Sequence, residues 1–452
     1  MRRLKKQRIA SFEEAENYIN ETPRFTTKNT MEDTKAFLHR LGDPDRRMRM
    51  IHVAGTNGKG SVCAYLRCIL EAAGYRTAVF TSPHLTDIRE RFVADGEMIS
   101  REDFLCVFLQ VYDMLDWEAG ERGECFYHPT YFEYLFFMAM LFFAEKAPDF
   151  CILETGLGGR LDATNAVSKK ELAVITRIGL DHVEYLGDTL KEIAGEKAGI
   201  MKAGTPAVYW DTCPETTRVF ESRAAKLGVS AQAVSKKDYR FLSFTNKSID
   251  FSLHTRYYNN INLTLHTIAG YQMENAALAV RAAELLDDGR AVTAEEVRRG
   301  VAECFWAGRM EEVLPEVYVD GAHNGDGIRA FLETVASDGA DGGRLLVFGV
   351  VQDKDYGRMA EELVSSRLFE RIYIAHLETK RGTDPEKLKA LFERYPDCSC
   401  RVCGGTEDAF RQALDDRERG QRVYIAGSLY LIGEIKEILA KRQDDREIDS
   451  RE

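Results

Sequence analysis

The sequence predicts an α/β protein with two successive, mostly parallel sheets, each covered by helices. Short apolar runs alternate with helical segments through most of the 452 residues, which is the pattern of parallel strands packed against helices. The length also exceeds what one ordinary core accommodates, and it predicts about two or three domains.

The first part of the chain contains five apolar runs that are expected to form one mostly parallel sheet. They are Met50–Ala54, Thr77–Phe80, Phe150–Leu153, Ala173–Ile178 and Pro206–Trp210. Around residues 238–267 the pattern changes to short alternating segments, which indicates a small antiparallel subregion. A helix is expected from Met273 to Leu286. The apolar stretch from Tyr131 to Ala144 is expected to be a buried core helix, because it is shorter than the roughly 20 residues of a membrane span.

A second alternating block begins at Glu316 and predicts a separate, Rossmann-like, doubly wound domain. Its expected strands are Val317–Val319, Leu345–Val350, Arg371–Ala375, Ser399–Val402 and Val423–Ala426. We expect the boundary near Gly308 to Pro315, which gives a first domain of residues 1–307 and a second of residues 308–452.

The net charge, the absence of long apolar runs and the cysteine pattern exclude several classes of function. The formal net charge of −12 argues against a nucleic-acid partner, which needs a basic surface. No membrane span or signal peptide is evident, and the scattered cysteines are typical of reduced thiols, so a cytoplasmic protein is expected. The close group Cys398, Cys400 and Cys403 raises the possibility of zinc, but no second ligand pair follows, and strand packing is favoured.

Polar or flexible residues follow nearly every predicted strand. In open parallel sheets, ligands bind beyond the carboxyl ends of the strands. These ends are GTNGKGS at 55–61, Thr81-Ser82, Glu154, Asp181-His182, Asp320-Gly-Ala-His323-Asn324, the stretch from Gln352 to Asp355, and Gly427-Ser428. Two sheets with such ends predict one site in the cleft between the domains.

The glycine-rich segment between the first strand and the next helix indicates nucleotide binding. It reads Gly55, Thr56, Asn57, Gly58, Lys59, Gly60, Ser61. The glycines let backbone N–H groups point inward, and the helix N-terminus adds partial positive charge. Lys59 supplies a charge for the terminal phosphates, and the Ser61 hydroxyl is suited to magnesium. The spacing departs from the common P-loop, and the alternative is a plain turn between strand and helix.

Glu154 is the best first-domain carboxylate for magnesium, which prefers carboxylate and hydroxyl oxygens together with phosphates and waters. It opens the run ETGLGGRLDATN, and the alternative is an ion pair with Arg160. His182, with Ser82, is a candidate for a second metal position, because it follows the end of a strand.

Lys197 lies within the apolar stripe of a helix predicted over Thr189–Met201. Apolar surroundings favour the neutral amine, which is a nucleophile. A neutral lysine can add carbon dioxide and become N6-carboxylysine, an anion able to help hold magnesium. The alternative is a lysine that extends its ammonium to water.

Longer motifs run through both predicted domains. They are GTNGKGS, TSPHL at 81–85, Tyr131-Phe132-Glu133 after Thr130, ETGLGGRLDATN, GLDHVEYLGDTLKEIAGEKAGI, WAGRMEE, DGAHN, DKD at 353–355 and GSLYLIGE. Together they resemble the folylpolyglutamate synthase/dihydrofolate synthase family of the wider Mur ligase group. The resemblance covers most of the chain.

The resemblance implies an ADP-forming amide ligase that uses ATP and two magnesium ions. ATP would phosphorylate a folate or dihydropteroate carboxylate, and the amino group of L-glutamate would attack the acyl phosphate. The implied metal residues are Ser61 and Glu154 for one ion, and Ser82, His182 and a carbamylated Lys197 near the other. A monomer is expected.

The resemblance also implies contacts for each substrate. Nucleotide contacts are expected from the loop residues, Asn275, Arg309 and Asp320, glutamate-side roles from Asp320, His323 and Ser428, and folate contacts from Asp162 and the loop Pro83–Arg91. The residue before Gln272 is usually histidine in the family and is Tyr271 here, which can still stack on adenine. His323 is a plausible base for the amine, and Asp320 is an alternative or a positioning group.

Two rival functions stay open on the sequence. A Mur-type ligase acting on a cell-wall nucleotide precursor shares the loop and the lysine, although the LGGRLDATN run favours folate. A nucleotide-gated binding module without ligase activity would not need the DGAHN and GSLY motifs.

Overall fold

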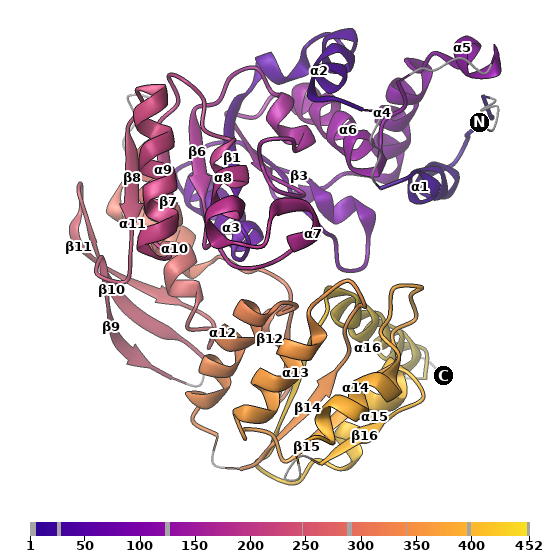
Figure 1. The fold of residues 1–452 in the computed structure, drawn as a ribbon, viewed down its shortest axis with the longest axis vertical. Helices are drawn as coiled ribbons and strands as arrows, with labels where there is room; N and C mark the ends of the chain where they lie inside the picture. Colours follow the sequence, from indigo (N-terminus) through magenta and orange to yellow (C-terminus); the bar gives the residue numbers. More distant parts are fainter. Residues whose placement is uncertain are drawn as a thin grey trace.

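The chain forms two α/β parts, each built around its own mostly parallel sheet, with the second part below the first in Figure 1. The computed structural model describes residues 6–24, 29–122, 127–245, 247–286, 292–340, 342–395 and 399–449. The predicted fold class is confirmed.

The first sheet has eight strands in the order β4-β3-β2-β5-β1-β6-β7-β8. From β2 to β8 the strands are parallel, whereas β3 and β4 are antiparallel additions at one edge. The bounds are β1 Arg49–Ala54, β2 Thr77–Phe80, β3 Phe92–Ala94, β4 Glu97–Met98, β5 Phe150–Glu154, β6 Leu172–Ile175, β7 Ala207–Trp210 and β8 Ala231–Val234. Because β1 is central and buried, the loop that follows it opens at the middle of the sheet's carboxyl edge.

Helices cover both faces of this sheet. They are α1 Phe12–Glu21, α2 Met31–Arg40, η1 Pro44–Arg47, α3 Lys59–Ala72, η2 Ile88–Arg91, α4 Arg101–Asp113, α5 Trp117–Arg122, α6 Tyr131–Lys146, η3 Ala163–Ala166, α7 Val183–Leu186, α8 Leu190–Ala198 and α9 Pro214–Leu227. The predicted core helix is α6, which is buried along most of its length in an aromatic-rich cluster with α1 and α4.

A three-stranded antiparallel sheet and two helices complete the first part. They are β9 Tyr239–Phe244, β10 Ile249–Thr255, β11 Asn259–Leu265, α10 Gln272–Glu284 and α11 Ala294–Ala302. Alternate residues of β10 face inward, for example Phe251 and Leu253, and join the core beneath α3 and α10. The antiparallel subregion expected at 238–267 is confirmed.

The second part is a six-stranded sheet in the order β12-β13-β17-β14-β15-β16, parallel except for β12. The strands are β12 Arg309–Leu314, β13 Val317–Asp320, β14 Arg344–Phe348, β15 Arg371–Ile374, β16 Cys400–Val402 and β17 Arg422–Ala426. The helices are α12 Gly325–Ala336, α13 Tyr356–Ser365, α14 Pro385–Phe392, α15 Thr406–Asp415 and α16 Leu429–Asp449.

Several element bounds differ from the predictions. The strand expected to reach Ile178 ends at Ile175, and the one expected to reach Val350 ends at Phe348, because turns to the site begin there. The helix after the glycine-rich loop starts at Lys59, so the last three residues of that motif belong to its first turn. The helix expected over Thr189–Met201 is shorter, since Thr189 caps its N-terminus.

Within the described ranges, no helix is long and apolar enough to cross a bilayer. No group of three histidine, cysteine, aspartate or glutamate side chains there is arranged to hold a metal by itself. Of the suspected zinc group, Cys398 lies outside the described residues, while Cys400 and Cys403 are free thiols on and just after β16.

Candidate active site

A cavity of about 350 Å³ lies where the carboxyl edges of the two sheets face each other. Side chains from both parts line it, among them Asn57, Ser61, Asn275, Arg309, Asp320 and His323. The structure therefore brings residues predicted from two distant stretches of sequence into one space.

The glycine-rich loop is fixed in place by the two residues that follow β6, Thr176 and Arg177. Thr56 N donates to the Arg177 carbonyl at 2.9 Å, and the Thr176 hydroxyl donates to the Asn57 carbonyl at 2.7 Å. Gly55 has φ of 155°, and a Cβ there would lie 1.7 Å from Thr176 Oγ1. The loop thus keeps its backbone turned toward the cavity only with glycine at this position.

Helix α10 supports the loop from the second side. The Gln272 amide donates to Ser61 Oγ at 3.3 Å, and Asn275 donates to Gln272 Oε1 at 2.8 Å. A Cβ on Gly58 would lie 2.2 Å from Asn275 Oδ1. Asn275 therefore rests directly on the loop, where the resemblance placed a nucleotide contact.

Lys59 and Glu154 meet at the start of α3. Lys59 Nζ donates to the Thr56 carbonyl at 3.2 Å and lies 4.0 Å from Glu154 Oε1. Ser82 N donates to Glu154 Oε2 at 3.0 Å. Burial raises the pKa of Glu154, and the charge of Lys59 opposes that effect. The alternative that Glu154 pairs with Arg160 is wrong, because Arg160 pairs with Glu196 at 2.9 Å.

The side chains around Glu154 suit a hard divalent cation. Glu154 is 3% exposed and accepts one hydrogen bond, so its carboxylate keeps unused lone pairs. Ser61 offers a buried hydroxyl oxygen beside it. Magnesium prefers such oxygens completed by phosphate and water, so the residues fit the ion when a nucleotide is present.

Lys197 lies beneath the glycine-rich loop. Its side chain is buried, and Nζ donates to the Gly55 carbonyl at 2.8 Å. Burial, and then the charge of Lys59, lower the pKa of Lys197 to about 7. The alternative of an ammonium extended to water is wrong, because the amine ends inside the protein.

Asp181 links the two parts and was absent from the predicted site residues. Lys354 Nζ donates to Asp181 Oδ1 at 2.6 Å, and Asn324 Nδ2 donates to Oδ2 at 3.0 Å. His323 Nε2 faces Oδ2 at 3.7 Å. Burial alone would raise the pKa of Asp181, but His323 and Lys354 outweigh it and hold the pKa well below its usual value.

His182 sits beside this cluster and is half-exposed. Its Nε2 is 3.4 Å from Lys354 Nζ and 3.9 Å from Asp181 Oδ1. Burial lowers the pKa of His182 to about 4. The charge of Asp181 opposes this shift, and that of Lys354 adds to it. A neutral imidazole at physiological pH has a lone pair available for a metal.

The two parts also touch through a reciprocal amide pair. Asn57 Nδ2 donates to Asn324 Oδ1 at 3.2 Å, and Asn324 Nδ2 donates to Asn57 Oδ1 at 3.0 Å. Asn324 caps α12 as well, so this helix points its N-terminus at the loop. This pairing was not predicted, although Asn57 lies in the GTNGKGS motif and Asn324 in the DGAHN motif.

Asp320 is engaged by three donors. Its carboxylate accepts hydrogen bonds from the Tyr271 hydroxyl at 2.5 Å, Met310 N at 3.0 Å and Ala322 N at 2.8 Å. Burial raises the pKa of Asp320, and Arg309 opposes this. With its lone pairs largely occupied, Asp320 holds the end of β13 in place.

His323 retains a free ring nitrogen. Its Nδ1 donates to the Gly321 carbonyl at 2.7 Å, which leaves the Nε2 lone pair facing the Asp181 carboxylate.

The residues expected to contact folate are spread along the first part's carboxyl edge. Pro83 follows a cis peptide bond after Ser82. Arg91 is buried and donates to His84 Nδ1 at 2.9 Å. Asp162 accepts hydrogen bonds from Leu157 N at 2.7 Å and from Thr164.

Ser428 stands apart from these residues, at the end of β17 in the second part. It is buried, and its hydroxyl accepts a hydrogen bond from Tyr430 N at 3.1 Å.

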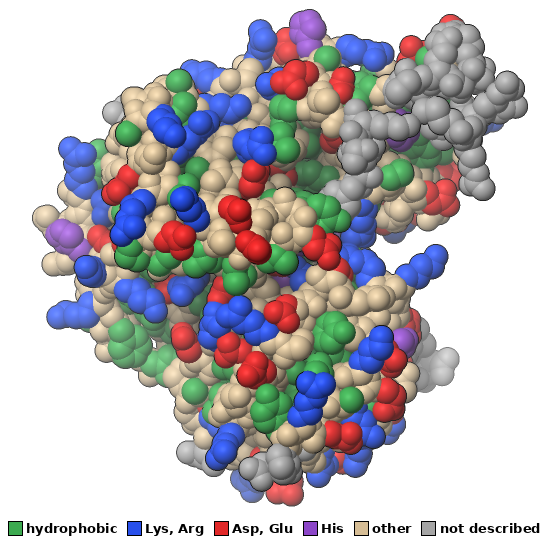
Figure 2. All heavy atoms as spheres, in the orientation of Figure 1, with side chains coloured by type: hydrophobic (Ala, Val, Ile, Leu, Met, Phe, Trp, Pro, Cys, Tyr) green, Lys and Arg blue, Asp and Glu red, His purple; other side chains and the backbone are tan. Residues whose placement is uncertain are grey.

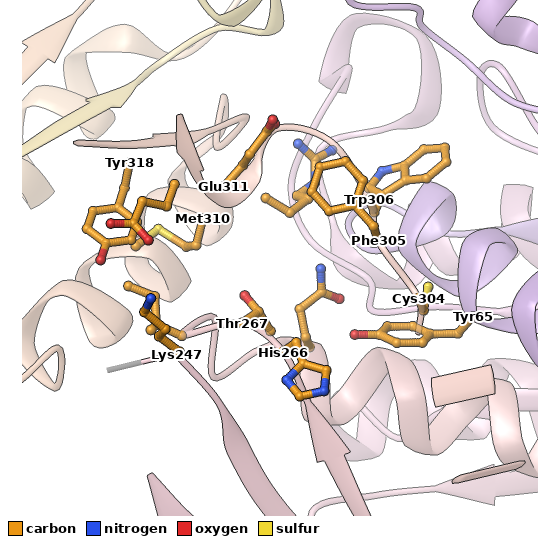
Figure 3. Close-up of a pocket in the computed structure, with 14 residues that line it drawn as sticks. Tyr65, Lys247, His266, Thr267, Cys304, Phe305, Trp306, Met310, Glu311 and Tyr318 are labelled. Carbon is orange, nitrogen blue, oxygen red and sulfur yellow. The ribbon is translucent and has the colours of Figure 1, made fainter. Parts of the chain in front are cut away.

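A larger cavity of about 530 Å³ lies behind α10, between α3 and the segment that joins the two parts. Figure 3 shows Cys304, Phe305 and Trp306 of the joining segment on the same side of the cavity as Tyr65 of α3. A Cβ on Gly60 would lie 2.7 Å from Trp306 Cζ2. The joining segment therefore packs against the glycine-rich loop itself.

Comparison with known proteins matches two family models. The Mur ligase middle domain matches residues 53–283, and the Mur ligase glutamate ligase domain matches residues 308–429. The chain is 34% identical over 439 residues to a dihydrofolate synthase/folylpolyglutamate synthase of Bacillus subtilis, covering 95% of this chain and 100% of that one.

Solved structures agree with the sequence matches. An Escherichia coli FolC in complex with DHPP and ADP superposes with a TM-score of 0.83 at 29% identity, covering 96% of this chain and 99% of that one. A Mycobacterium tuberculosis folylpolyglutamate synthase complexed with ADP has a TM-score of 0.85 at 28% identity, covering 95% and 98%.

Proposed function

The chain belongs to the folylpolyglutamate synthase/dihydrofolate synthase family of the Mur ligases, and from this premise we propose that it is an ADP-forming ligase joining L-glutamate to folates. Relatives named for this activity match along nearly the whole chain. They do not favour the alternative of a Mur-type ligase on a cell-wall precursor. A binding module without ligase activity does not account for the polar side chains of the second part that surround Asp181. They are His323, Asn324 and Lys354.

One observation carries the proposal: the glycine-rich loop and the His323-Asn324 turn face each other across a single cavity. ATP would bind with its phosphates along the loop, near Lys59 and the N-terminus of α3. The second part would present glutamate from the opposite side. This places the attacking amine and the activated carboxylate at one point.

The residues present divide the chemistry between them. Transfer of the terminal phosphoryl group to a substrate carboxylate gives an acyl phosphate, and Lys59 offsets the accumulating negative charge. Ser61 and Glu154 would hold a magnesium ion, which would supply further charge neutralisation, and Ser82, His182 and a carbamylated Lys197 would hold a second ion.

The amine of glutamate must lose a proton when it attacks. We assign the acceptor role to His323 Nε2, because His323 Nδ1 is occupied by the Gly321 carbonyl and Nε2 is the ring nitrogen left for the amine. Asp320 is saturated with donors and has a positioning role. The tetrahedral intermediate then expels phosphate and leaves the amide.

The proposal also covers the domain bounds, the substrate contacts, the oligomeric state and the cellular location. Residues 1–307 form the ATP-binding domain and residues 308–452 the glutamate-ligase domain. Asn275, Arg309 and Asp320 contact the nucleotide, Pro83, Arg91 and Asp162 contact the pterin substrate, and Ser428 contacts glutamate. The protein acts as a cytoplasmic monomer.

The test is glutamate-dependent ADP release, measured in parallel with dihydropteroate and tetrahydrofolate. Lys59→Ala is expected to lower the rate by roughly a hundredfold or more, because it removes a charge beside the transferred phosphoryl group. Lys191→Ala is the matched control, since Lys191 lies exposed on α8. No response of the wild type to either pterin would remove the folate assignment.

A further inference from the structure

Three arginines converge on two tyrosines at the mouth of the cleft. Arg24 donates to the Tyr430 hydroxyl at 3.4 Å, and Arg381 donates to the same oxygen at 3.0 Å. Arg24 and Arg91 lie over the Tyr131 ring, 5.4 Å and 5.6 Å from its centroid. Arg24 and Arg91 belong to the first part and Arg381 to the second, so the cluster spans the cleft.

The cluster carries more positive than negative charge. Arg381 pairs with Asp353. Among the residues that the structure describes, no carboxylate forms an ion pair with Arg24 or Arg91, and the neighbour of Arg91 is the neutral ring of His84. Burial, and then the charge of Arg91, lower the pKa of His84 to about 4.

Such an excess of charge is costly without a counter-ion. Arg91 is 5% exposed, and within the described part of the chain its guanidinium makes one hydrogen bond with its five N–H donors. Burying a guanidinium without a counter-ion costs free energy, and an anion that binds beside it recovers part of that cost. Figure 2 shows lysine and arginine side chains (blue) together with acidic ones (red) along the opening between the two parts.

The cluster adjoins the reaction site on both sides. Tyr430 N donates to Ser428 Oγ at 3.1 Å on the proposed glutamate side. Arg91 lies close enough to Glu154 for that carboxylate to oppose the lowering of the Arg91 pKa by burial. A second carboxylate of the substrate, next to the one being activated, would lie between Tyr430 on one side and Arg91 on the other.

Glutamate chemistry specifies which anion this is. A glutamyl terminus carries two carboxylates, of which one is phosphorylated while the other stays anionic throughout the reaction. Dihydropteroate has a single carboxylate, and that group reacts. A ligase acting on glutamylated pterins therefore needs a cationic place for a carboxylate that dihydropteroate lacks.

We propose that Arg24, Arg381 and the Tyr430 hydroxyl form a subsite for the non-reacting carboxylate of a glutamylated pterin, with Arg91 adding charge beside it. The inference rests on the proposed function and deepens it. The subsite sets the preference for glutamylated over unglutamylated substrates, because only the former fill it.

The test is equilibrium binding of tetrahydropteroate and its monoglutamate to the full chain with ADP and magnesium, by titration calorimetry. The wild type is expected to bind the monoglutamate more tightly. Arg24→Gln and Arg381→Gln are each expected to lower the ratio of the two affinities about tenfold, because each removes a charged donor. Arg381→Lys keeps the charge without the planar fork and should retain part of the ratio.

Arg411→Gln is the matched control, since Arg411 is paired with acidic neighbours on the surface of α15. A ratio unchanged in both cleft variants, or equal losses for both ligands, would overturn the subsite. Thermal melting of each variant separates these results from a folding defect. Failure of the proposed function is distinct, because it appears as absent glutamate-dependent ADP release in the wild type.

Discussion

The amine of Lys197 donates to the carbonyl of Gly55 at 2.8 Å, which puts a buried lysine directly under the turn that is proposed to receive phosphate. No carboxylate pairs with this amine among the described residues, and burial lowers its pKa to about 7. A substantial neutral fraction therefore exists at physiological pH, and a neutral amine is the form that reacts with carbon dioxide.

We expect Lys197 to incorporate label from ¹³C-bicarbonate, seen as a carbamate carbon by NMR. Because the folded pKa is lowered to about 7, the signal should be strong above that pH and disappear as protonation removes the nucleophile below it. Lys197→Met should lose the signal and most of the activity, whereas Lys202→Met should keep both. Equal labelling of the wild type and Lys197→Met would contradict the assignment.

Glu154→Gln is expected to raise the magnesium concentration needed for half-maximal ADP release. The substitution preserves shape and the contact with Ser82 N but removes the anionic oxygen facing Lys59. We expect roughly a tenfold increase or more, since even groups behind the first ligands of a metal are worth about 10–100-fold. Glu145→Gln, on the exposed side of α6, should behave as wild type.

Asp181→Asn should lower both stability and turnover. It removes the carboxylate that pairs with buried Lys354 at 2.6 Å, which is expected to cost about 2 kcal/mol or more. The folded pKa of Asp181 is depressed, so its contribution is present above the unfolded value near 3.8 and is lost as pH falls below it.

The melting temperatures of wild type and Asp181→Asn should therefore differ at pH 7 and converge in strong acid. Asp415→Asn is a matched control, since its arginine pair is exposed on α15. A difference that persists undiminished below the unfolded pKa would show that the charge is not the cause.

Gly60→Ala should impair nucleotide use by about tenfold, because the new methyl group would lie 2.7 Å from Trp306 Cζ2. The indole is a rigid ring and not the end of a flexible chain, so the loop must move. Adding Trp306→Leu should restore part of the affinity for ADP, measured by calorimetry. If Gly60→Ala binds ADP as wild type does, the joining segment does not constrain the loop.

The sequence predicted the central strands because parallel strands buried on both faces are continuous apolar runs. It did not predict the edge strands β8, β12 and β4, whose sequences AQAV, RMEEVL and EM are mixed or polar. At an edge, pairing with a neighbour decides the structure, and a local pattern does not carry that information.

The residues of the candidate site also fall into two groups, those that a local pattern predicts and those that only contacts in the folded chain reveal. Lys197 and Glu154 were predicted because each breaks an apolar pattern at a strand end or on a helix face. Asp181 was predicted to lie at a strand end beside His182 but was given no role of its own, since that role comes from Lys354 in the other part. Arg24 and Arg381 lie outside helices and strands, and only the folded chain reveals that they share Tyr430.

The amide pair between Asn57 and Asn324 has a consequence for the catalytic cycle. Each bond contributes about 0.5–1.5 kcal/mol net, because water satisfies both amides equally well once they separate. The amide pair is uncharged, so its own strength depends little on ionic strength, whereas the Asp181–Lys354 ion pair beside it is sensitive to salt. The amide pair therefore adds little to the cost of separating the two parts, while its reciprocal geometry specifies one register for their contact.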